Sequence, residues 1–203
     1  MRRSELVRAL ERVPPPEHPR AELEQVVTPP ERVADLLEAT STEGGLVGRS
    51  VVDLGSGTGR LAIGAALLGG RPVLGIEKDP ALVRVAEASA LALGVAVEFR
   101  VREVEGFVGS ADFVVMNPPF GAQRKGADRP FWDAAFTTAR RAILAFALAE
   151  SRTFIARRAV ARSAHIVATR PVLWELPRTF AHHSRRRVPL DVDLWTIRTD
   201  QEP

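Results

Sequence analysis

The sequence predicts an α/β protein, in which helices alternate with the strands of a mainly parallel sheet. Two short apolar runs, at residues 51–54 and 72–76, are each followed by a helical pattern, at residues 60–68 and from Pro80 onward. Another apolar run follows at residues 113–116. Parallel strands need a crossover connection, which is usually a helix, so this alternation is typical of βαβ units.

The carboxyl-terminal half continues the pattern. It predicts a strand at residues 142–148, a helix at 151–164 capped by Ser151, and strands at 171–176 and 190–198. In the last strand one set of side chains alternates with another, Val192, Leu194 and Thr196 against Asp191, Asp193 and Trp195. Such alternation favours a strand near the edge of the sheet.

The first predicted strand runs into a glycine-rich turn with Gly55, Gly57 and Gly59. Glycine lets the backbone approach a ligand closely and adopt positive φ, so this turn is typical of a nucleotide-type cofactor loop. Asp53 lies two residues before the loop, and we expect it to bind the cofactor together with the three glycines. Glu77 ends the second strand, where its carboxylate can accept both hydroxyls of a ribose. The alternative is an ordinary strand-to-helix turn with a solvated acidic residue at the strand end.

The tetrapeptide Asn117, Pro118, Pro119 and Phe120 follows the run at residues 113–116. Methyl transfer to an exocyclic amine needs acceptors for both amine hydrogens, which the Asn117 side-chain oxygen and the Pro118 carbonyl can supply. Proline restricts φ and so holds these carbonyls in place, and Phe120 offers a ring on which a flipped base can stack. The alternative is an Asn-Pro turn after a buried strand.

In this order, these motifs resemble the class I S-adenosylmethionine-dependent methyltransferases. The resemblance implies a seven-stranded, Rossmann-like sheet with an antiparallel last strand. Within that superfamily the chain resembles the archaeal and eukaryotic small-subunit rRNA adenine-N6 methyltransferases of the methyltransferase-like-five type. The segments that carry this likeness are Leu23 to Gln25 with Thr28, Asn117 to Gly121, Lys125 and Gly126 with Asp128 and Phe131, Glu175 to Pro177, His183 with Arg185 to Arg187, and Asp191 to Leu194.

The resemblance also implies a role for individual residues. Those that would bind the cofactor are Gln25 and Thr28 at its methionine end, Gly55 and Thr58 along it, Glu77 at the ribose, and Glu103 with the Val104 backbone at the adenine. Thr28 has a second interpretation, because Thr28, Pro29, Pro30 and Glu31 fit a helix capping box. Family members from eukaryotes work with a small zinc-binding activator subunit, so such a partner is an expectation from the resemblance.

Length and composition predict one catalytic domain. The chain has 203 residues, 45% of them hydrophobic, and we expect an N-terminal helix and proline-rich linker at residues 1–20 before a domain at 21–203. The sequence contains no cysteine, which excludes disulfides and cysteine-ligated zinc within it, and its four histidines lack ligand-like spacing. No signal-peptide pattern or membrane span is recognisable, so we expect a soluble, cytoplasmic protein without a catalytic metal.

Positive charge is concentrated in the second half. Residues 120–190 contain 14 Lys or Arg and four Asp or Glu, a net charge of about +10. A phosphate backbone would be attracted to such a segment. The residues that we expect to bind RNA are Lys125, His183, Arg185, Arg186 and Arg187. The arginine pairs at 140–141 and 157–158 are interpreted instead as solvated helix positions.

The sequence therefore predicts methyl transfer to the N6 amine of an adenosine flipped out of small-subunit rRNA, with Asn117 and Pro118 holding the amine. Transfer to guanine N2 in RNA or to glutamine N5 in a protein would use the same acceptors. A protein of another class, an inactive RNA-binding scaffold that keeps the fold, is the third alternative. The intact glycine loop, Glu77 and Asn117 favour an enzyme.

Overall fold

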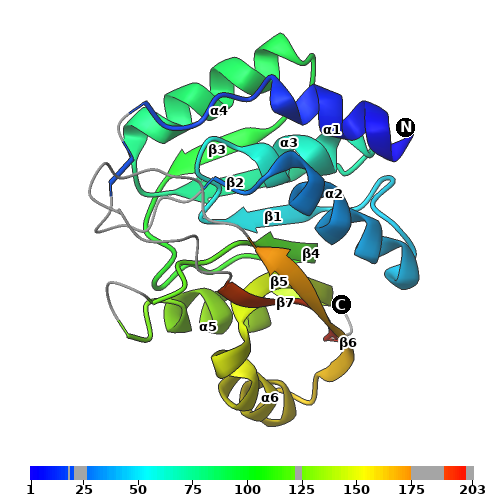
Figure 1. Cartoon of the computed structure of the whole chain (residues 1–203), viewed down its shortest axis with the longest axis vertical. Helices are drawn as coiled ribbons and strands as arrows, with labels where there is room; N and C mark the ends of the chain where they lie inside the picture. Colours follow the sequence, from blue (N-terminus) through cyan, green and yellow to red (C-terminus); the bar gives the residue numbers. More distant parts are fainter. Residues whose placement is uncertain (18, 21–26, 122–124, 175–189, 200–203) are drawn as a thin grey trace.

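The computed structural model describes residues 1–17, 19–20, 27–121, 125–174 and 190–199. Its centre is a seven-stranded sheet with the order β3-β2-β1-β4-β5-β7-β6 (Figure 1). The strands are β1 Val51–Leu54, β2 Val73–Glu77, β3 Glu98–Val101, β4 Ala111–Met116, β5 Ala139–Leu148, β6 His165–Trp174 and β7 Leu190–Arg198.

The sheet is parallel except at β7. Strand β1 lies between β2 and β4, and β4 pairs with β5, all in parallel. Strand β7 is antiparallel to both of its neighbours, β5 and β6. The predicted α/β fold, with seven strands and an antiparallel last strand, is therefore confirmed.

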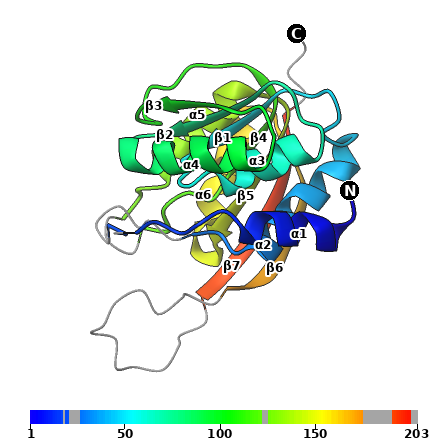
Figure 2. The ribbon, with the colours of Figure 1, turned by 90° about the horizontal axis from the view of Figure 1, so that it is seen from above.

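Helices cover both faces of the sheet (Figures 1 and 2). Helices α1, α2, α3 and α4 cover one face, and α5 and α6 cover the other. Their bounds are α1 Arg3–Glu11, α2 Pro30–Glu38, α3 Arg60–Leu67, α4 Pro80–Ala92, α5 Arg129–Thr138 and α6 Arg152–Ala161. Two short 3-10 helices, η2 Ala39–Glu43 and η3 Ala149–Ser151, complete the described elements.

Two layers of core follow from the two-residue period of the strands. In β4, Phe113 and Val115 pack in the core under α1 to α4, whereas Val114 and Met116 pack in the core under α5 and α6. All four side chains are fully buried. Because both faces of the central strands are covered, these strands are continuous apolar runs, which is why the sequence reveals them.

Helix α6 differs from its prediction at both ends. It begins at Arg152, and Ser151 occupies the N-cap position without making a side-chain capping bond. It ends at Ala161, because Ser163 adopts a left-handed φ of 53°, after which β6 starts at His165. The strand predicted at 171–176 is thus the end of the longer strand β6. Residues 175 and 176 of the prediction lie outside the residues that the structure describes.

The alternation of side chains predicted that the last strand lies near the edge of the sheet, and β7 is the second strand from that edge. However, both faces of β7 are buried. Asp193 and Trp195 are 1% and 2% exposed. The buried carboxylate of Asp193 is satisfied by Arg152, whose Nε and Nη2 donate to its two oxygens at 2.6 and 2.8 Å. Pairing with this arginine allows a charged side chain to lie in a buried strand.

The interpretation of the arginine pair at 140–141 as helical was wrong. Both residues lie in β5 and are half-buried. Arg140 forms an ion pair with Asp112 at 3.4 Å, and the Arg141 side chain donates to the carbonyl of Glu43. Arg157 and Arg158 do lie on a helix, α6, where Arg157 is exposed and Arg158 pairs with Asp133 at 3.2 Å.

None of the helices in the described part of the chain has the length and apolar character that a bilayer crossing requires. Likewise, the described residues contain no group of three or more His, Asp or Glu arranged to hold a metal ion.

Candidate active site

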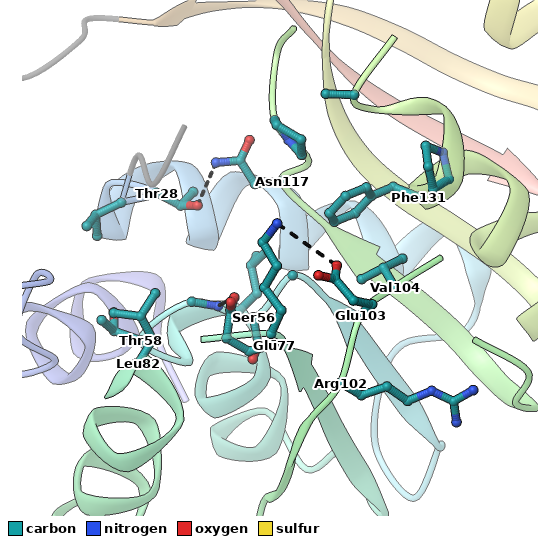
Figure 3. A pocket seen from close by; sticks show the side chains of 18 of the residues that line it. Thr28, Ser56, Thr58, Glu77, Leu82, Arg102, Glu103, Val104, Asn117 and Phe131 are labelled. Atoms are coloured by element: carbon teal, nitrogen blue, oxygen red, sulfur yellow. Dashed lines mark hydrogen bonds and ion pairs between the residues drawn. The ribbon is translucent and has the colours of Figure 1, made fainter. Parts of the chain in front are cut away.

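A cavity of about 350 Å³ lies at the carboxyl ends of β1, β2 and β4 (Figure 3). In parallel α/β sheets ligands bind at this edge, and the volume lies in the range of small-molecule sites. The cavity is lined by the loops after those strands, by the start of α5 and by the segment before α2. Predicted site residues that line it are Thr28, Gly55, Gly57, Thr58, Glu77, Glu103, Val104, Asn117 and Pro119.

The glycine loop connects β1 to α3. Gly55 and Gly57 have φ values of +75° and +54°, which disfavour other residues. A Cβ atom on Gly55 would also lie 2.7 Å from the ring of Phe131, so this position has two reasons to be glycine. The N–H groups of Gly55 and Ser56 donate to the Ile76 carbonyl at 2.8 and 2.9 Å, which holds the loop against the end of β2.

Glu77 joins that loop to the next one. One carboxylate oxygen accepts the Gly57 N–H at 2.9 Å, and the other accepts the Asp79 N–H at 2.9 Å. Only 8% of the residue is exposed, and it lines the cavity. Each oxygen keeps a further lone pair, so a ligand hydroxyl can bind without disturbing either loop.

Asp53 and Gly59 are not among the residues that line the cavity. Asp53 is fully buried, and its Oδ2 accepts the N–H of Ala62 in the first turn of α3 at 3.0 Å. Burial raises the pKa of Asp53 to about 8, against the opposing effect of the Ala62 hydrogen bond. The structure thus places this residue beneath α3, and its role at the cofactor stays a prediction.

Thr28 and Asn117 meet at the opposite side of the cavity (Figure 3). The Asn117 side-chain nitrogen donates to the Thr28 hydroxyl at 2.9 Å, while the Asn117 side-chain oxygen is buried without a partner among the described residues. Thr28 does not cap α2: the N-cap is Pro29, and no side chain caps this helix. The capping-box interpretation was therefore wrong, because the hydroxyl bonds to Asn117 instead.

The two prolines and Phe120 extend from β4 along the cavity. Pro119 lines it, whereas Pro118 is buried. Phe120 is half-buried and packs edge-on against Trp174, with ring centroids 5.5 Å apart. Phe120 is not among the cavity-lining residues, and the aromatic side chain that does line the cavity is Phe131 at the start of α5.

The loop after β3 forms the remaining wall. Val104 is buried, and Glu103 is exposed and lies 3.9 Å from the ammonium group of Lys78. The cavity is also lined by residues for which the sequence predicted no role: Pro16, Val27, Ser56, Arg60, Leu61, Lys78, Leu82, Arg102, Glu105, Gly126, Ala127, Pro130 and Phe131. Ser56 and Lys78 are direct neighbours of predicted residues, and that adjacency is the signal that could have found them.

The predicted RNA-binding residues are only partly described. Lys125 is exposed, and its neighbour Gly126 lines the cavity. His183, Arg185, Arg186 and Arg187 lie outside the described residues, as does Gln25 among the predicted cofactor ligands.

Comparison with known proteins adds to this geometry. The sequence profile of the methyltransferase small domain matches residues 34–145 of the chain, which include the glycine loop, Glu77 and Asn117. The chain belongs to the methyltransferase small-domain family. In this methyltransferase the matched region contains β1 to β4, whose carboxyl ends form most of the cavity.

Several relatives match this methyltransferase over nearly their whole length. A protein of unassigned function from Methanocaldococcus jannaschii is 30% identical over 192 residues, which cover 89% of this chain and 86% of that protein. The rRNA N(6)-adenosine-methyltransferase Mettl5 of Drosophila melanogaster is 28% identical over 194 residues, 92% of this chain and 91% of the relative. The crystal structure of a proposed RNA methyltransferase from Pyrococcus horikoshii has a TM-score of 0.87 and 32% identity, covering 98% of this chain and 96% of that one.

Proposed function

We propose that this protein transfers a methyl group from S-adenosylmethionine to the N6 amine of an adenosine in small-subunit rRNA. Membership of the methyltransferase family supports the reaction type. The similarity to Mettl5, a protein named as an rRNA N(6)-adenosine methyltransferase, extends over most of both chains and supports the substrate. The same name is borne by the zebrafish relative, which is 28% identical over 207 residues.

The cavity residues fit the cofactor. Ser56 has a buried hydroxyl with no partner among the described residues, and Glu77 has acceptor capacity left for ribose hydroxyls. The space above Gly57 is open, since a Cβ atom there would meet nothing within 4 Å. Glu103 and Val104 form the wall at which the adenine would lie. When bound, the cofactor supplies an electrophilic methyl group on a sulfonium.

Asn117 carries the proposal. Its side-chain oxygen is buried, lacks a partner among the described residues and belongs to a side chain that lines the cavity. An amine hydrogen of the substrate would satisfy this oxygen, and the Pro118 carbonyl would accept the second hydrogen. Held in this way, the amine nitrogen would present its lone pair to the sulfonium methyl group that the cofactor supplies. Transfer would form the N–C bond as the S–C bond breaks, and the nitrogen would then release its proton to water.

Phe120 and Phe131 are the aromatic residues available to the base. We retain the prediction that the exposed part of Phe120 stacks on the flipped adenosine, while Phe131 packs against the glycine loop on the cofactor side. RNA would approach over Lys125 and the basic segment that contains His183, Arg185, Arg186 and Arg187. We also propose a small zinc-binding activator subunit as partner, and the cytoplasm as the site of action, by analogy with the family.

The decisive experiment is methyl transfer from labelled S-adenosylmethionine to unmethylated small-subunit rRNA, with tRNA, DNA and ribosomal protein in parallel, followed by nucleoside analysis. We expect N6-methyladenosine in the rRNA alone. Label in N2-methylguanosine or in protein would overturn the proposed substrate in favour of those alternatives. No label, with and without an added activator subunit, together with no cofactor binding, would support the inactive scaffold.

The variant Asn117→Ala links this activity to the site. We expect transfer to fall by at least about a hundredfold, because the acceptor for the amine is lost, while the cofactor Kd changes by less than about threefold. Equal losses in transfer and in cofactor affinity would mean that Asn117 shapes the cavity rather than binding the substrate.

A further inference from the structure

An amide side chain has one accepting end and one donating end, and only the accepting end can bind the hydrogens of an amine. If the carboxamide of Asn117 were turned by half a rotation, its NH₂ group would face the substrate amine, and donor would oppose donor. The proposed reaction therefore requires more than an asparagine at this position. It requires a contact that holds the amide with its oxygen left for the substrate.

In the structure Thr28 holds the donating end of this amide. Its hydroxyl oxygen accepts the Asn117 Nδ2–H at 2.9 Å, and this leaves Oδ1 as the end without a partner among the described residues (Figure 3). The hydroxyl is not used for capping α2, as described above. Thr28 is only 8% exposed, so little water competes for the bond.

Arg60 in turn fixes Thr28. Its Nη1 donates to the Thr28 carbonyl at 3.1 Å, and its Nη2 and Nε donate to the Val13 carbonyl at 2.6 and 3.3 Å. Arg60 is the first residue of α3, directly after Gly59 of the glycine loop. A planar guanidinium can donate to two carbonyls at once in a fixed geometry, which the single ammonium group of a lysine cannot reproduce.

We propose that Arg60 and Thr28 are positioning residues, which orient the Asn117 carboxamide so that its oxygen faces the substrate amine. This inference rests on the proposed function and assigns to Thr28 a task separate from holding the cofactor. It also explains why the segment before α2 contacts a tetrapeptide 89 residues later in the sequence. Because Arg60 directly follows the glycine loop, the amide would be held from the same segment on which the cofactor would lie.

The test is Thr28→Val, which keeps the shape of the side chain and removes the hydroxyl, with Thr28→Ser as the matched control. For Thr28→Val we expect kcat for rRNA methylation to fall about tenfold to a hundredfold, because the amide is no longer held in one orientation. The KM for RNA should change by less than about threefold, and the fall in kcat should persist at saturating cofactor, whatever the cofactor Kd of the variant. Thr28→Ser should recover most of kcat.

Three results would overturn the inference. The first is a kcat within twofold of the wild type in Thr28→Val. The second is a loss confined to the cofactor Kd, which would make Thr28 a cofactor ligand only. The third is an equal loss in Thr28→Ser and Thr28→Val, accompanied by a lower unfolding temperature, which would indicate a packing role. An inactive wild-type protein would instead contradict the proposed function itself, so the two failures are distinguishable.

Arg60→Lys tests the contact between Arg60 and the Thr28 carbonyl. We expect a smaller fall in kcat than in Thr28→Val, and little further fall when both substitutions are combined, because the two residues act through the same amide. Fully additive losses would show that Arg60 acts on the reaction by another route, and would remove it from the proposal.

Discussion

The carboxylate of Glu77 accepts the backbone N–H of Gly57 at 2.9 Å and so ties the end of β2 to the glycine loop after β1. Its second oxygen accepts the N–H of Asp79, the N-cap residue of α4. One side chain thus fixes two loops at the rim of the cavity. The same carboxylate is the predicted ribose acceptor, so its structural and binding tasks are linked.

Glu77→Gln should weaken both tasks. An amide has one acceptor oxygen, so its NH₂ group must face either the Gly57 N–H or the Asp79 N–H. We expect the cofactor Kd to rise at least about tenfold, which isothermal titration calorimetry would measure. Glu98→Gln, on the exposed strand β3, is the control and should bind normally. Equal affinities in the two variants would count against Glu77 as a ligand.

Gly55→Ala should damage the cavity more than a similar change elsewhere. The new Cβ would lie 2.7 Å from the Phe131 ring, in addition to the strain of φ +75°. Gly94→Ala has a comparable φ of +67° but no atom within 4 Å, so it isolates the backbone strain. We expect both variants to lose about 1 kcal/mol or more of stability. Only Gly55→Ala should also lose cofactor affinity, and similar binding by both variants would refute the clash with Phe131.

Asp53 should make the protein less stable as the pH rises. Burial raises its folded-state pKa to about 8, whereas an unfolded aspartate titrates near 3.8. Between these values the folded state holds a proton that the unfolded state has lost, so the free energy of unfolding falls with rising pH by up to about 1.4 kcal/mol per pH unit. Urea unfolding at pH 5, 7 and 9 would show this slope, and it should flatten in Asp53→Asn. An unchanged slope in the variant would assign the effect to another group.

Asp112 should act in the opposite direction. Burial opposes its ionisation, but hydrogen bonds from the N–H and hydroxyl of Ser50, together with the Arg140 charge, lower its pKa overall. A depressed pKa stabilises the fold above the unfolded value near 3.8, and this contribution is lost as the pH falls through the folded value. Acid unfolding followed by circular dichroism should therefore differ between the wild type and Asp112→Asn at neutral pH and converge in strong acid. A difference that stays constant with pH would mean that the effect of the substitution is not electrostatic.

Most of the site was predictable because its signals are local. The glycine loop, Glu77 at the strand end and the tetrapeptide after β4 are each contained in a few consecutive residues. The burial of Asp53 beneath α3 was not predicted, although the two-residue period of a strand indicates it. Val52 and Leu54 pack in the core beneath α5 and α6, so Asp53 faces the opposite side, beneath α3.

The sequence by itself determined most of the order of strands and helices, the glycine loop that lines the cavity and the amide side chain at position 117. These depend on short-range patterns of burial, backbone conformation and side-chain type. The tertiary structure alone decided how Asn117 is oriented, because its partner Thr28 is 89 residues away and is brought to it only when the segment before α2 packs beside β4. It also decided that Arg140 lies in a strand and that the buried Asp193 pairs with the exposed Arg152. Local chemistry leaves several side-chain orientations open, and contacts between distant segments decide which one is adopted. Such orientations therefore cannot be derived from the spacing of residues in the sequence.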